Sequence, residues 1–466
     1  MGINSYSLKN FKKFGVVDIN EYFCTFLFAR YYKMIIQKTL ALSVLTAVLS
    51  SFASYAVAQD SNPSNLTSSP YTRYGFGKLG TVGNASTRGM GDVGIALRTN
   101  LYTNLYNPAS LTAIDTLTML FDTALDAKMV SRSENGSSES DWNAGFGYFS
   151  FHFPLWNRFA GAISYMPYST VGYEYGIEET IAVDNSIFTN DTLSHTDAYT
   201  GNGGLQHFQL SMAWNPIKTR KTRLDLGVTA GYICGNIEHT GSMYVSSGQG
   251  NSTSTSREFS CIGWDITLGA QYTQLLRPGR LMTVGVTYAP QTHIGCDCDI
   301  TKTSGTSSIE TESRLNLSVP SKFGVGVSYQ MDRKLTVAAD YAFEQWSNVK
   351  GIDNNLKLQD AIYQDVSHFS VGAEYRPKLY AKDYLQTCLY RVGFSARNSY
   401  ILAFDNKEYS VSCGMGMPVG KRSLLNLAVS YTHIKPNGGS ALKENFLGVT
   451  LGMTFNEMMF YRSKLR

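Results

Sequence analysis

The chain has 466 residues, of which 16% are charged, and a formal net charge of +4. Residues 1–58 hold six of the 40 basic and two of the 36 acidic side chains, so 34 of each kind remain in the rest of the chain. The excess of positive charge therefore belongs to the N-terminal region. Because no basic stripe stands out elsewhere, the composition does not indicate nucleic-acid binding.

Residues 34–58 are predicted to form a secretion signal. Met34 begins a segment with one lysine, Lys38, and an uncharged apolar run that ends in Ala-Val-Ala at positions 56–58, the small-residue pattern that signal peptidase cleaves. The run is short and no basic stop follows it, which argues against a transmembrane anchor. The 33 residues before Met34 match no targeting signal, so we interpret them as upstream of the true start and assign residues 1–58 to a leader.

Residues 59–116 are rich in glycine and in polar and aromatic residues, and no strand periodicity runs through them. This stretch is too small to form a core of its own, so another part of the chain must bury it. Pro108 cannot continue a helix or donate to a strand ladder, and it biases Asn107 towards an extended or turn conformation. We therefore predict that Asn107, Pro108 and Ala109 form the corner between this stretch and the first strand.

Two matches to the pattern GxGxxG occur here, at residues 75–80 and 89–94. A dinucleotide site needs this pattern between a strand and a helix of a βαβ unit, and no such unit is visible. We therefore expect no cofactor. Gly89, Gly91 and Gly94 are instead expected to let the backbone pack closely and adopt positive φ angles.

The rest of the chain alternates apolar and small residues with a period of two. Residues 447–455, for example, place Leu, Val, Leu, Met and Phe at odd positions and Gly or Thr between them. A β-strand sends successive side chains to opposite faces, so each such segment has one apolar face. The other face carries Gly, Ser, Thr, Ala and Asn with few Lys or Glu, which is unusual for a soluble β-sandwich. Many apolar faces end in an aromatic residue, as at a membrane interface.

The pattern predicts an all-β fold, a 14-stranded antiparallel transmembrane β-barrel at residues 117–458 with an N-terminal hatch, residues 59–116, in its lumen. The predicted strands are 117–131, 142–155, 158–175, 205–215, 222–236, 258–273, 280–292, 319–331, 334–346, 365–377, 386–397, 407–418, 424–434 and 444–456. The predicted long loops are 131–141, 176–204, 246–256, 293–318 and 347–364. Short turns on one side and long loops on the other are typical of outer-membrane barrels, whose turns are periplasmic.

Several charged residues fall on the small, polar faces of these strands. They are Asp225, Asp265, Asp340, Glu374, Arg223 and Arg391. Charges cost far less in a polar lumen than on a lipid-facing surface. We expect them to form networks that hold the hatch.

Pro167 interrupts the predicted third strand. Proline removes a ladder donor, so inside a closed barrel it should mark a bulge or a gap. Pro290, Pro377 and Pro418 lie near strand ends, where proline is harmless, and the same explanation is open for Pro167. The residues alone thus predict a bulge, a gap or a strand end at Pro167.

The segment HIGCDCD, residues 293–299, falls in a predicted outer loop. Its thiols and imidazole suit zinc or copper, but the spacing fits no common site, so we expect an exposed loop and no metal. The six cysteines after the leader do not indicate a disulfide framework, and their pairing cannot be deduced. No GxSxG elbow or Ser/His/acid arrangement stands out, so we expect no catalytic residue and no enzyme activity.

The order of these features resembles the long-chain fatty-acid transporter family of Gram-negative outer membranes, the FadL-like and toluene-transporter-like barrels. The resemblance rests on GMGDVGIA with Gly89, Gly91 and Gly94, on YNPASL with Asn107, Pro108, Ala109 and Leu111, and on the strand opening at 319–330. It covers nearly all of the mature chain in architecture, but only the N-terminal block in motif. It implies a hatch inside the barrel, uptake of hydrophobic molecules, and ligand exit beside a kinked third strand. In this chain the predicted third strand carries Pro167, which the resemblance makes the candidate lateral gate.

We therefore predict an outer-membrane channel for passive uptake of hydrophobic small molecules such as long-chain fatty acids, through hatch rearrangement and a lateral wall opening. The expected partners are the hydrophobic ligand and outer-membrane lipid. The alternative is a barrel component of a protein-secretion or surface-attachment system that binds a periplasmic or secreted protein. The basic C-terminal tail, residues 459–466, keeps this open because it could dock such a partner. A structural barrel without transport is a third alternative.

Overall fold

The computed structural model describes residues 69–458, apart from residue 116 and residues 135–136, 184–190, 246–251, 353–357, 360–361, 379–380, 403–405, 421 and 436–441. The predicted leader, the first ten residues of the predicted hatch and the predicted C-terminal tail lie outside the described residues. Within the described ranges, no helix is long and apolar enough to cross a membrane.

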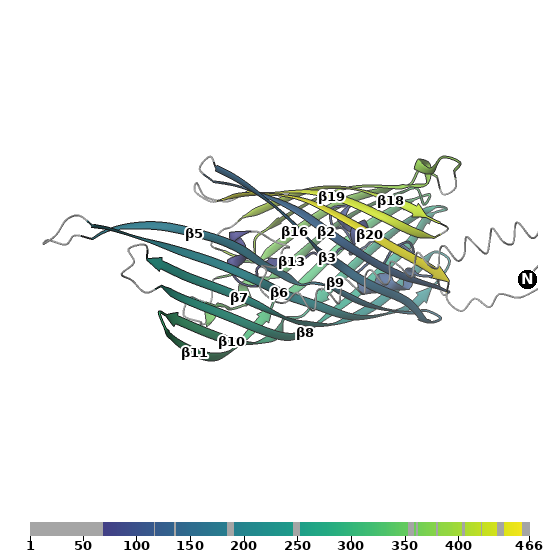
Figure 1. The fold of residues 1–466 in the computed structure, drawn as a ribbon. Helices are drawn as coiled ribbons and strands as arrows, with labels where there is room; N and C mark the ends of the chain where they lie inside the picture. Colours follow the sequence, from purple (N-terminus) through teal and green to yellow (C-terminus); the bar gives the residue numbers. More distant parts are fainter. Residues whose placement is uncertain are drawn as a thin grey trace, which may run out of the picture. The chain divides into compact units, whose positions relative to one another are not determined.

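Antiparallel strands wrap round into a closed barrel (Figure 1). Fourteen strands make the wall, and three of them are interrupted, so each of these three carries two labels. The uninterrupted strands are β2 (Thr118–Glu134), β3 (Ser137–Trp156), β6 (Asp191–Lys218), β7 (Thr222–Val245), β8 (Thr253–Arg277), β13 (Leu335–Gln345), β16 (Val366–Tyr375), β17 (Leu389–Asn398), β18 (Lys407–Val419), β19 (Ser423–Lys435) and β20 (Lys443–Met458). The interrupted strands are β4 (Phe159–Pro167) with β5 (Ser169–Val183), β9 (Arg280–Ala289) with β10 (Thr292–Ser304), and β11 (Ser307–Val319) with β12 (Ser321–Met331).

The last wall strand, β20, closes the barrel by pairing with the first, β2. Their ladder runs from Thr118 opposite Met458 to Ser133 opposite Lys443. The other ladders are antiparallel as well. The predicted 14-stranded antiparallel barrel is therefore confirmed.

The two faces of the wall differ as the alternation predicted. In β20, Leu447 and Leu451 expose 37% and 47% of their surface, whereas Thr450 and Thr454 on the other face are buried. Apolar side chains continue this exposed belt on other strands, among them Leu210, Trp264, Leu268, Val286, Phe323, Val392 and Val411. A closed wall with an apolar outer face and a small, polar inner face is the architecture of a barrel that spans the outer membrane.

The strands extend further than predicted, and three of the predicted loops are wrong. The described residues of 131–141 belong to β2 and β3, which pair as far as Glu134 opposite Ser137. Residues 176–204 lie largely in the β5–β6 hairpin, and residues 293–318 form the β10–β11 hairpin.

Residues 307–312 of β11 are exposed on both faces, so the apolar alternation that reveals a strand in lipid is lost there. Thr, Ser and Tyr nevertheless favour extended backbone, and the ladders continue through these residues. At the start of β10, by contrast, buried Cys296 and Cys298 alternate with exposed Asp297 and Asp299.

The wall is broken beside Pro167, where β4 ends. The β3–β4 ladder stops at Phe149 opposite Tyr165. Beyond the break, β5 pairs with β6, but no ladder joins β5 to β3 among the described residues. Instead, the short strand β1 (Lys78–Leu79) pairs with the start of β5, with Lys78 opposite Thr170.

Residues 69–115, which we name the lumen segment, contact inward-facing side chains of many wall strands. The segment contains η2 (Pro70–Arg73), β1, α2 (Ala85–Arg88) and η3 (Pro108–Ala113). Its hydrogen bonds reach β2, β3, β5, β7, β8, β12, β13, β18 and β20. Contacts that point to strands all around the barrel place this segment inside it, and Figure 1 shows its purple elements between the walls.

Glycines on the inner face of the wall let the lumen segment approach to backbone contact. A Cβ atom on Gly393 in β17 would collide with the backbone of Met90 and Gly91, and one on Gly372 in β16 would collide with Met90. Further wall glycines with such close neighbours in the lumen segment are Gly227, Gly269, Gly285 and Gly452. The small inner face of the strands is thus a docking surface for the lumen segment.

The variant Gly393→Ala is expected to destabilise the folded barrel by about 1–3 kcal/mol, since backbone atoms cannot move aside as a flexible side chain can. Gly295→Ala in β10 is the control, because a Cβ there has no neighbour closer than 3.8 Å. Thermal unfolding, followed by the loss of the compact electrophoretic form, measures both variants. Equal midpoints for Gly393→Ala and Gly295→Ala would contradict the docking of the lumen segment against this glycine.

Candidate functional site

The predicted corner residues lie at the point where the lumen segment meets β7 and β8. The side chain of Asn107 accepts a hydrogen bond from the backbone N–H of Ala109 (3.0 Å) and so caps η3. Its Nδ2 donates to the backbone carbonyl of Ile95 (2.9 Å) and to that of Ala270 in β8 (3.2 Å). The fixed φ of Pro108 suits the first turn of η3. All three predicted corner residues are buried, and the chain enters β2 shortly after η3.

Two of the three predicted glycines, Gly91 and Gly94, bring backbone amides to the wall. The predicted positive φ is found at Gly91 alone of the three, since Gly89 has a φ of −66° and donates to Ala85 within the lumen segment. Gly91, with φ of +72°, donates its N–H to the hydroxyl of Ser412 in β18 (2.8 Å). The N–H groups of Gly94 and Ile95 both donate to one carboxylate oxygen of Asp340 in β13 (2.6 and 2.8 Å). Successive N–H groups that converge on a carboxylate form an anion site, and here the anion is a side chain of the wall.

The helix α2 is held by side chains of β2 and β3. Arg88 at its end forms an ion pair with Asp126 in β2, with N–O distances of 2.5 and 2.6 Å. At its start, the backbone N–H of Ala85 donates to the hydroxyl of Tyr148 in β3 (3.0 Å), which in turn donates to Asp122 (2.9 Å). These charges are buried, so the low local dielectric strengthens the pairing that satisfies them.

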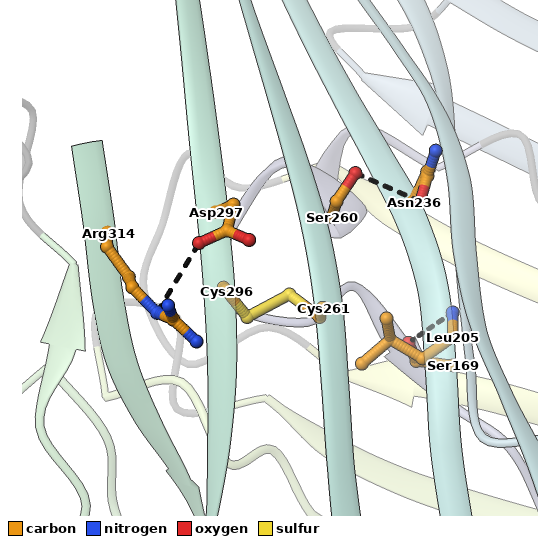
Figure 2. Close-up of a disulfide and its surroundings, with 8 residues drawn as sticks. All are labelled: Ser169, Leu205, Asn236, Ser260, Cys261, Cys296, Asp297 and Arg314. Carbon is orange, nitrogen blue, oxygen red and sulfur yellow. Dashed lines mark hydrogen bonds and ion pairs between the residues drawn. A yellow bond between two sulfur atoms is a disulfide. The ribbon is translucent and has the colours of Figure 1, made fainter. Parts of the chain in front are cut away.

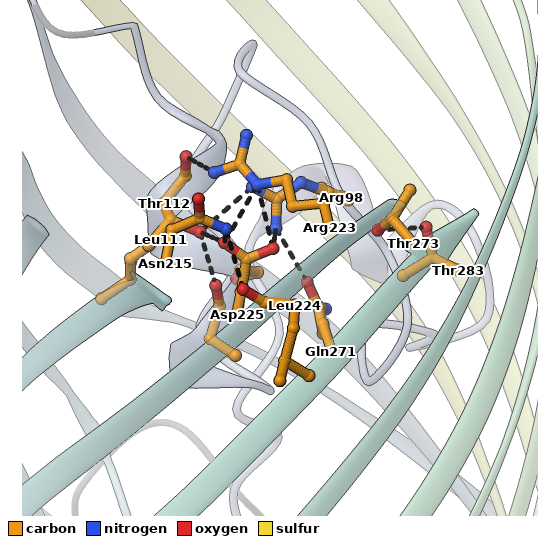
Figure 3. A network of polar contacts seen from close by, with 12 residues as sticks. Arg98, Leu111, Thr112, Asn215, Arg223, Leu224, Asp225, Gln271, Thr273 and Thr283 are labelled. Carbon is orange, nitrogen blue, oxygen red and sulfur yellow. Dashed lines mark hydrogen bonds and ion pairs between the residues drawn. The ribbon is translucent and has the colours of Figure 1, made fainter. Parts of the chain in front are cut away.

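A third anchor is centred on Asp225 in β7 (Figure 3). Its carboxylate accepts from Arg98 (2.8 Å) and Thr112 (2.5 Å) of the lumen segment. Two wall side chains also donate to it, Arg223 through Nε (3.0 Å) and Asn215 through Nδ2 (2.6 Å). One fully buried carboxylate therefore ties two separate parts of the lumen segment to the wall.

The expected networks of charged residues hold the lumen segment only in part. Asp225 and Asp340 do so, as described above. Arg391 binds Glu374 (2.7 Å) and lies over the ring of Tyr102 in the lumen segment, 5.3 Å from its centre. Asp265 was expected in this role as well, but it pairs with His207 of the wall (2.8 Å).

Residues 69–82 of the lumen segment, which we name the gate segment, are held differently. Arg73 donates to the hydroxyl of Tyr175 (2.7 Å) and lies 4.1 Å from the centre of the Tyr199 ring. The two-residue ladder of β1 with β5 is its backbone link to the wall at the break. The hydroxyl of Ser69 also donates to the buried carboxylate of Glu444 in β20 (2.7 Å), and two backbone N–H groups of the segment donate to wall carbonyls. Unlike residues 84–113, however, the gate segment forms no ion pair with a wall carboxylate among the described residues.

Phe76 lies at the centre of the gate segment, in a turn flanked by Gly75 (φ +63°) and Gly77 (φ +80°). Its ring packs against that of Trp346, 6.2 Å between centres. The hydroxyl of Tyr400 accepts from the N–H of Phe76 (3.1 Å) and donates to the carbonyl of Gly77 (2.7 Å). Burial raises the pKa of this Tyr400 phenol well above its ordinary value, so the proton that it donates stays in place.

A cavity of about 510 Å³ lies on the extracellular side of Phe76. Its lining combines aromatic rings with basic groups. The aromatic residues are Tyr74, Phe76, Tyr173, Tyr199, Phe259 and Tyr363, and the charged ones are Arg73, Arg257, Lys302 and Asp197. We name it the outer cavity.

Two smaller cavities, of about 200 and 170 Å³, lie beyond the gate segment. Both are lined by Leu79, Gly80 and Thr81 of the gate segment and by Pro167 at the wall break. We name them the inner cavities. The candidate gate residue Pro167 therefore lies where the inner cavities, the gate segment and the interruption of the wall meet.

The segment HIGCDCD was wrongly predicted to be a loop, because it forms most of β10. Cys296 is joined to Cys261 in β8 by a disulfide, which Figure 2 shows bridging the two strands. Cys298 is buried on the same face, whereas Asp297 is exposed on the other and lies 3.5 Å from Arg314. Among the described residues, no group of three or more His, Cys, Asp or Glu is placed to hold a metal ion.

A family model described as BamG matches residues 35–466. Among solved structures, the chain is similar to the Pseudomonas putida toluene transporter TodX (17% identity, covering 81% of this chain and 98% of that one, TM-score 0.51). It is also similar to the Ralstonia pickettii toluene transporter TbuX (17%, 83% and 99%, 0.50) and to a Pseudomonas aeruginosa FadL homologue (11%, 81% and 98%, 0.51). At these identities the likeness concerns the fold, and the expected FadL-like fold is confirmed. No curated protein sequence matches the chain.

The variant Asp225→Asn is expected to lower the free energy of unfolding by about 3–5 kcal/mol, because it leaves the buried Arg98 without its counter-charge. The control is Asp297→Asn, which removes an exposed partner of Arg314 and should leave the stability nearly unchanged. Denaturant unfolding in detergent micelles measures both. A loss of stability that is no larger for Asp225→Asn than for the control would contradict the anchoring role of Asp225.

Proposed function

The chain belongs to the BamG family, and on that premise we propose that it takes up hydrophobic small molecules across the outer membrane and releases them sideways through the wall break. The observation that carries this proposal is the meeting of both inner cavities at Pro167, where the β3–β4 ladder ends. A closed barrel offers its contents no path into lipid, so an interruption of the wall beside a cavity is the natural exit. The toluene transporters of similar fold support this class of function.

Long-chain fatty acids are the ligands that we favour. The outer cavity offers aromatic rings for an apolar chain and three basic residues, Arg73, Arg257 and Lys302, against one acid, Asp197. A pocket that is largely apolar with a few charged groups selects molecules of matching amphipathic character. A carboxylate with a hydrocarbon tail fits this lining better than a neutral hydrocarbon does.

Transfer from the outer cavity to the inner cavities requires the gate segment to move. Phe76 and its aromatic neighbours separate the two regions, and the flanking glycines give this turn backbone freedom. The anchors at Asp126, Asp225 and Asp340 hold residues 84–113 in place. We therefore infer that the hatch moves only in its first part and that the remainder belongs functionally to the wall.

The test is whether the barrel retains a fatty acid in its inner cavities. The barrel is purified in a detergent unlike natural lipids, incubated with oleic acid, separated from free acid, and extracted for mass spectrometry. The native protein is expected to retain about one acid per barrel, and Thr81→Trp should lose it, since the indole fills the space shared by both inner cavities. Val392→Trp is the matched control, because it adds the same ring on the lipid-facing side, where Val392 is 60% exposed.

Equal amounts of acid in Thr81→Trp and Val392→Trp would contradict binding in the inner cavities. A native barrel that retains no acid but co-purifies with a periplasmic or secreted protein would favour the alternative, a barrel of a secretion or surface-attachment system. The tail at residues 459–466, which motivated this alternative, lies outside the described residues.

A further inference from the structure

The rim of the barrel that carries the short turns is strongly basic. Its basic residues, exposed or partly exposed, are Arg158, Lys218, Arg220, Lys221, Arg277, Arg280, Arg333, Lys334, Arg376, Lys378, Lys382 and Arg422. The acidic residues described on the same rim are Asp115, Asp332, Asp383 and Glu457. The basic residues come from all six connections between strands on this side, so positive charge follows the rim around the barrel.

The opposite end of the molecule carries charges of both signs, but on the extended parts of β7, β8, β10 and β11 the acidic residues outnumber the basic ones, which are Arg257, Lys302 and Arg314. Glu238, Glu258, Asp299 and Glu312 lie directly opposite one another in the ladders of β7, β8, β10 and β11. Although the chain after the leader has equal numbers of acidic and basic residues, its charges are thus separated along the barrel axis in this sector.

The basic side chains of the rim are available to a ligand. Among the described residues, none of them forms an ion pair with a carboxylate. Neighbouring turns also touch, because the backbone N–H of Arg376 donates to the carbonyl of Lys334 (2.6 Å). Charges from two turns are therefore concentrated at one place on the rim.

Exposed apolar side chains fix the depth of these charges in the membrane. Trp156 is 68% exposed and lies two residues before Arg158, and Leu276 is 53% exposed and lies next to Arg277. In the connection between β16 and β17, Leu385 is 63% exposed. Tryptophan and tyrosine at the edge of a lipid-facing belt lie at the level of the headgroups. The adjacent guanidinium and ammonium groups then lie at the level of the lipid phosphates.

We propose that the basic rim docks anionic phospholipids of the periplasmic leaflet through their phosphate groups. Short turns mark the periplasmic side of an outer-membrane barrel. Lysine and arginine near an anionic membrane surface are attracted to it over about one Debye length, ~8 Å at physiological salt. Positive charge around the whole perimeter can contact a ring of lipids. A single acidic protein would need positive charge on one side of the rim only. This docking is independent of the ligand that the barrel takes up.

Lipid selectivity is measured by electron paramagnetic resonance of the barrel reconstituted in phosphatidylcholine vesicles with a trace of spin-labelled lipid. The native barrel is expected to restrict the motion of labelled phosphatidylglycerol at least about twofold more than that of labelled phosphatidylcholine. The preference should fall when four rim charges are neutralised by Arg277→Gln, Arg280→Gln, Arg333→Gln and Lys334→Gln. A second variant with only two substitutions, Lys378→Gln and Lys382→Gln, carries less risk to folding. It should lower the preference for phosphatidylglycerol in part.

The matched control neutralises basic residues at the other end of the barrel, by Lys407→Gln, Lys435→Gln and Lys443→Gln, and should keep the preference. Equal restriction of the two labelled lipids by the native barrel would overturn the proposal. It would favour an acidic protein, in place of lipid, as the partner of the basic rim. A preference that survives both rim variants and disappears in the control would overturn it as well.

Discussion

Backbone contact between the lumen segment and the glycines of the wall is the constraint on which the rest of this structure depends. Because Gly372 and Gly393 lack a Cβ atom, the backbone at Met90 and Gly91 lies directly against the sheet. This closeness brings the amides of the lumen segment within hydrogen-bond reach of buried wall carboxylates such as Asp340. A carboxylate buried without such partners would cost several kcal/mol, so close packing and electrostatics require each other here.

The same constraint divides the lumen segment into two functional parts. Residues 84–113 combine glycine contacts with the carboxylate anchors, and they behave as an inner layer of the wall. The gate segment, residues 69–82, has a two-residue ladder, aromatic contacts, a hydrogen bond from Ser69 to Glu444 and a turn with two glycines at positive φ, but no ion pair with the wall among the described residues. Since it separates the outer cavity from the inner cavities and also borders the wall break, its weaker attachment is what the proposed transport requires.

The wall could be predicted because lipid imposes a strict period of two on every strand that crosses it. The irregular backbone at Pro108, which begins η3, and at Pro167, which ends β4, could be located because proline limits its local backbone whatever surrounds it. The strand extension in β11 could not, since exposure of both faces removes the alternation. The Cys261–Cys296 pairing could not either, because it depends on the register between β8 and β10. The partners of Arg88 and Arg98 depend on the register of distant strands, which no local pattern reveals. The cavities were missed as well, because their linings combine residues from strands that are distant in the sequence.

The most direct test of this account is to lock the gate segment to the wall. Leu79 and Ser169 are opposite each other in the β1–β5 ladder, so Leu79→Cys with Ser169→Cys should form a disulfide, with the native free cysteines replaced by serine. The account predicts that oxidation stops the uptake of radiolabelled oleate by proteoliposomes and that a reductant restores it. Val411→Cys with Tyr431→Cys, which joins two wall strands on the lipid-facing side, should change nothing. Undiminished uptake with the Leu79–Ser169 link formed would contradict the account.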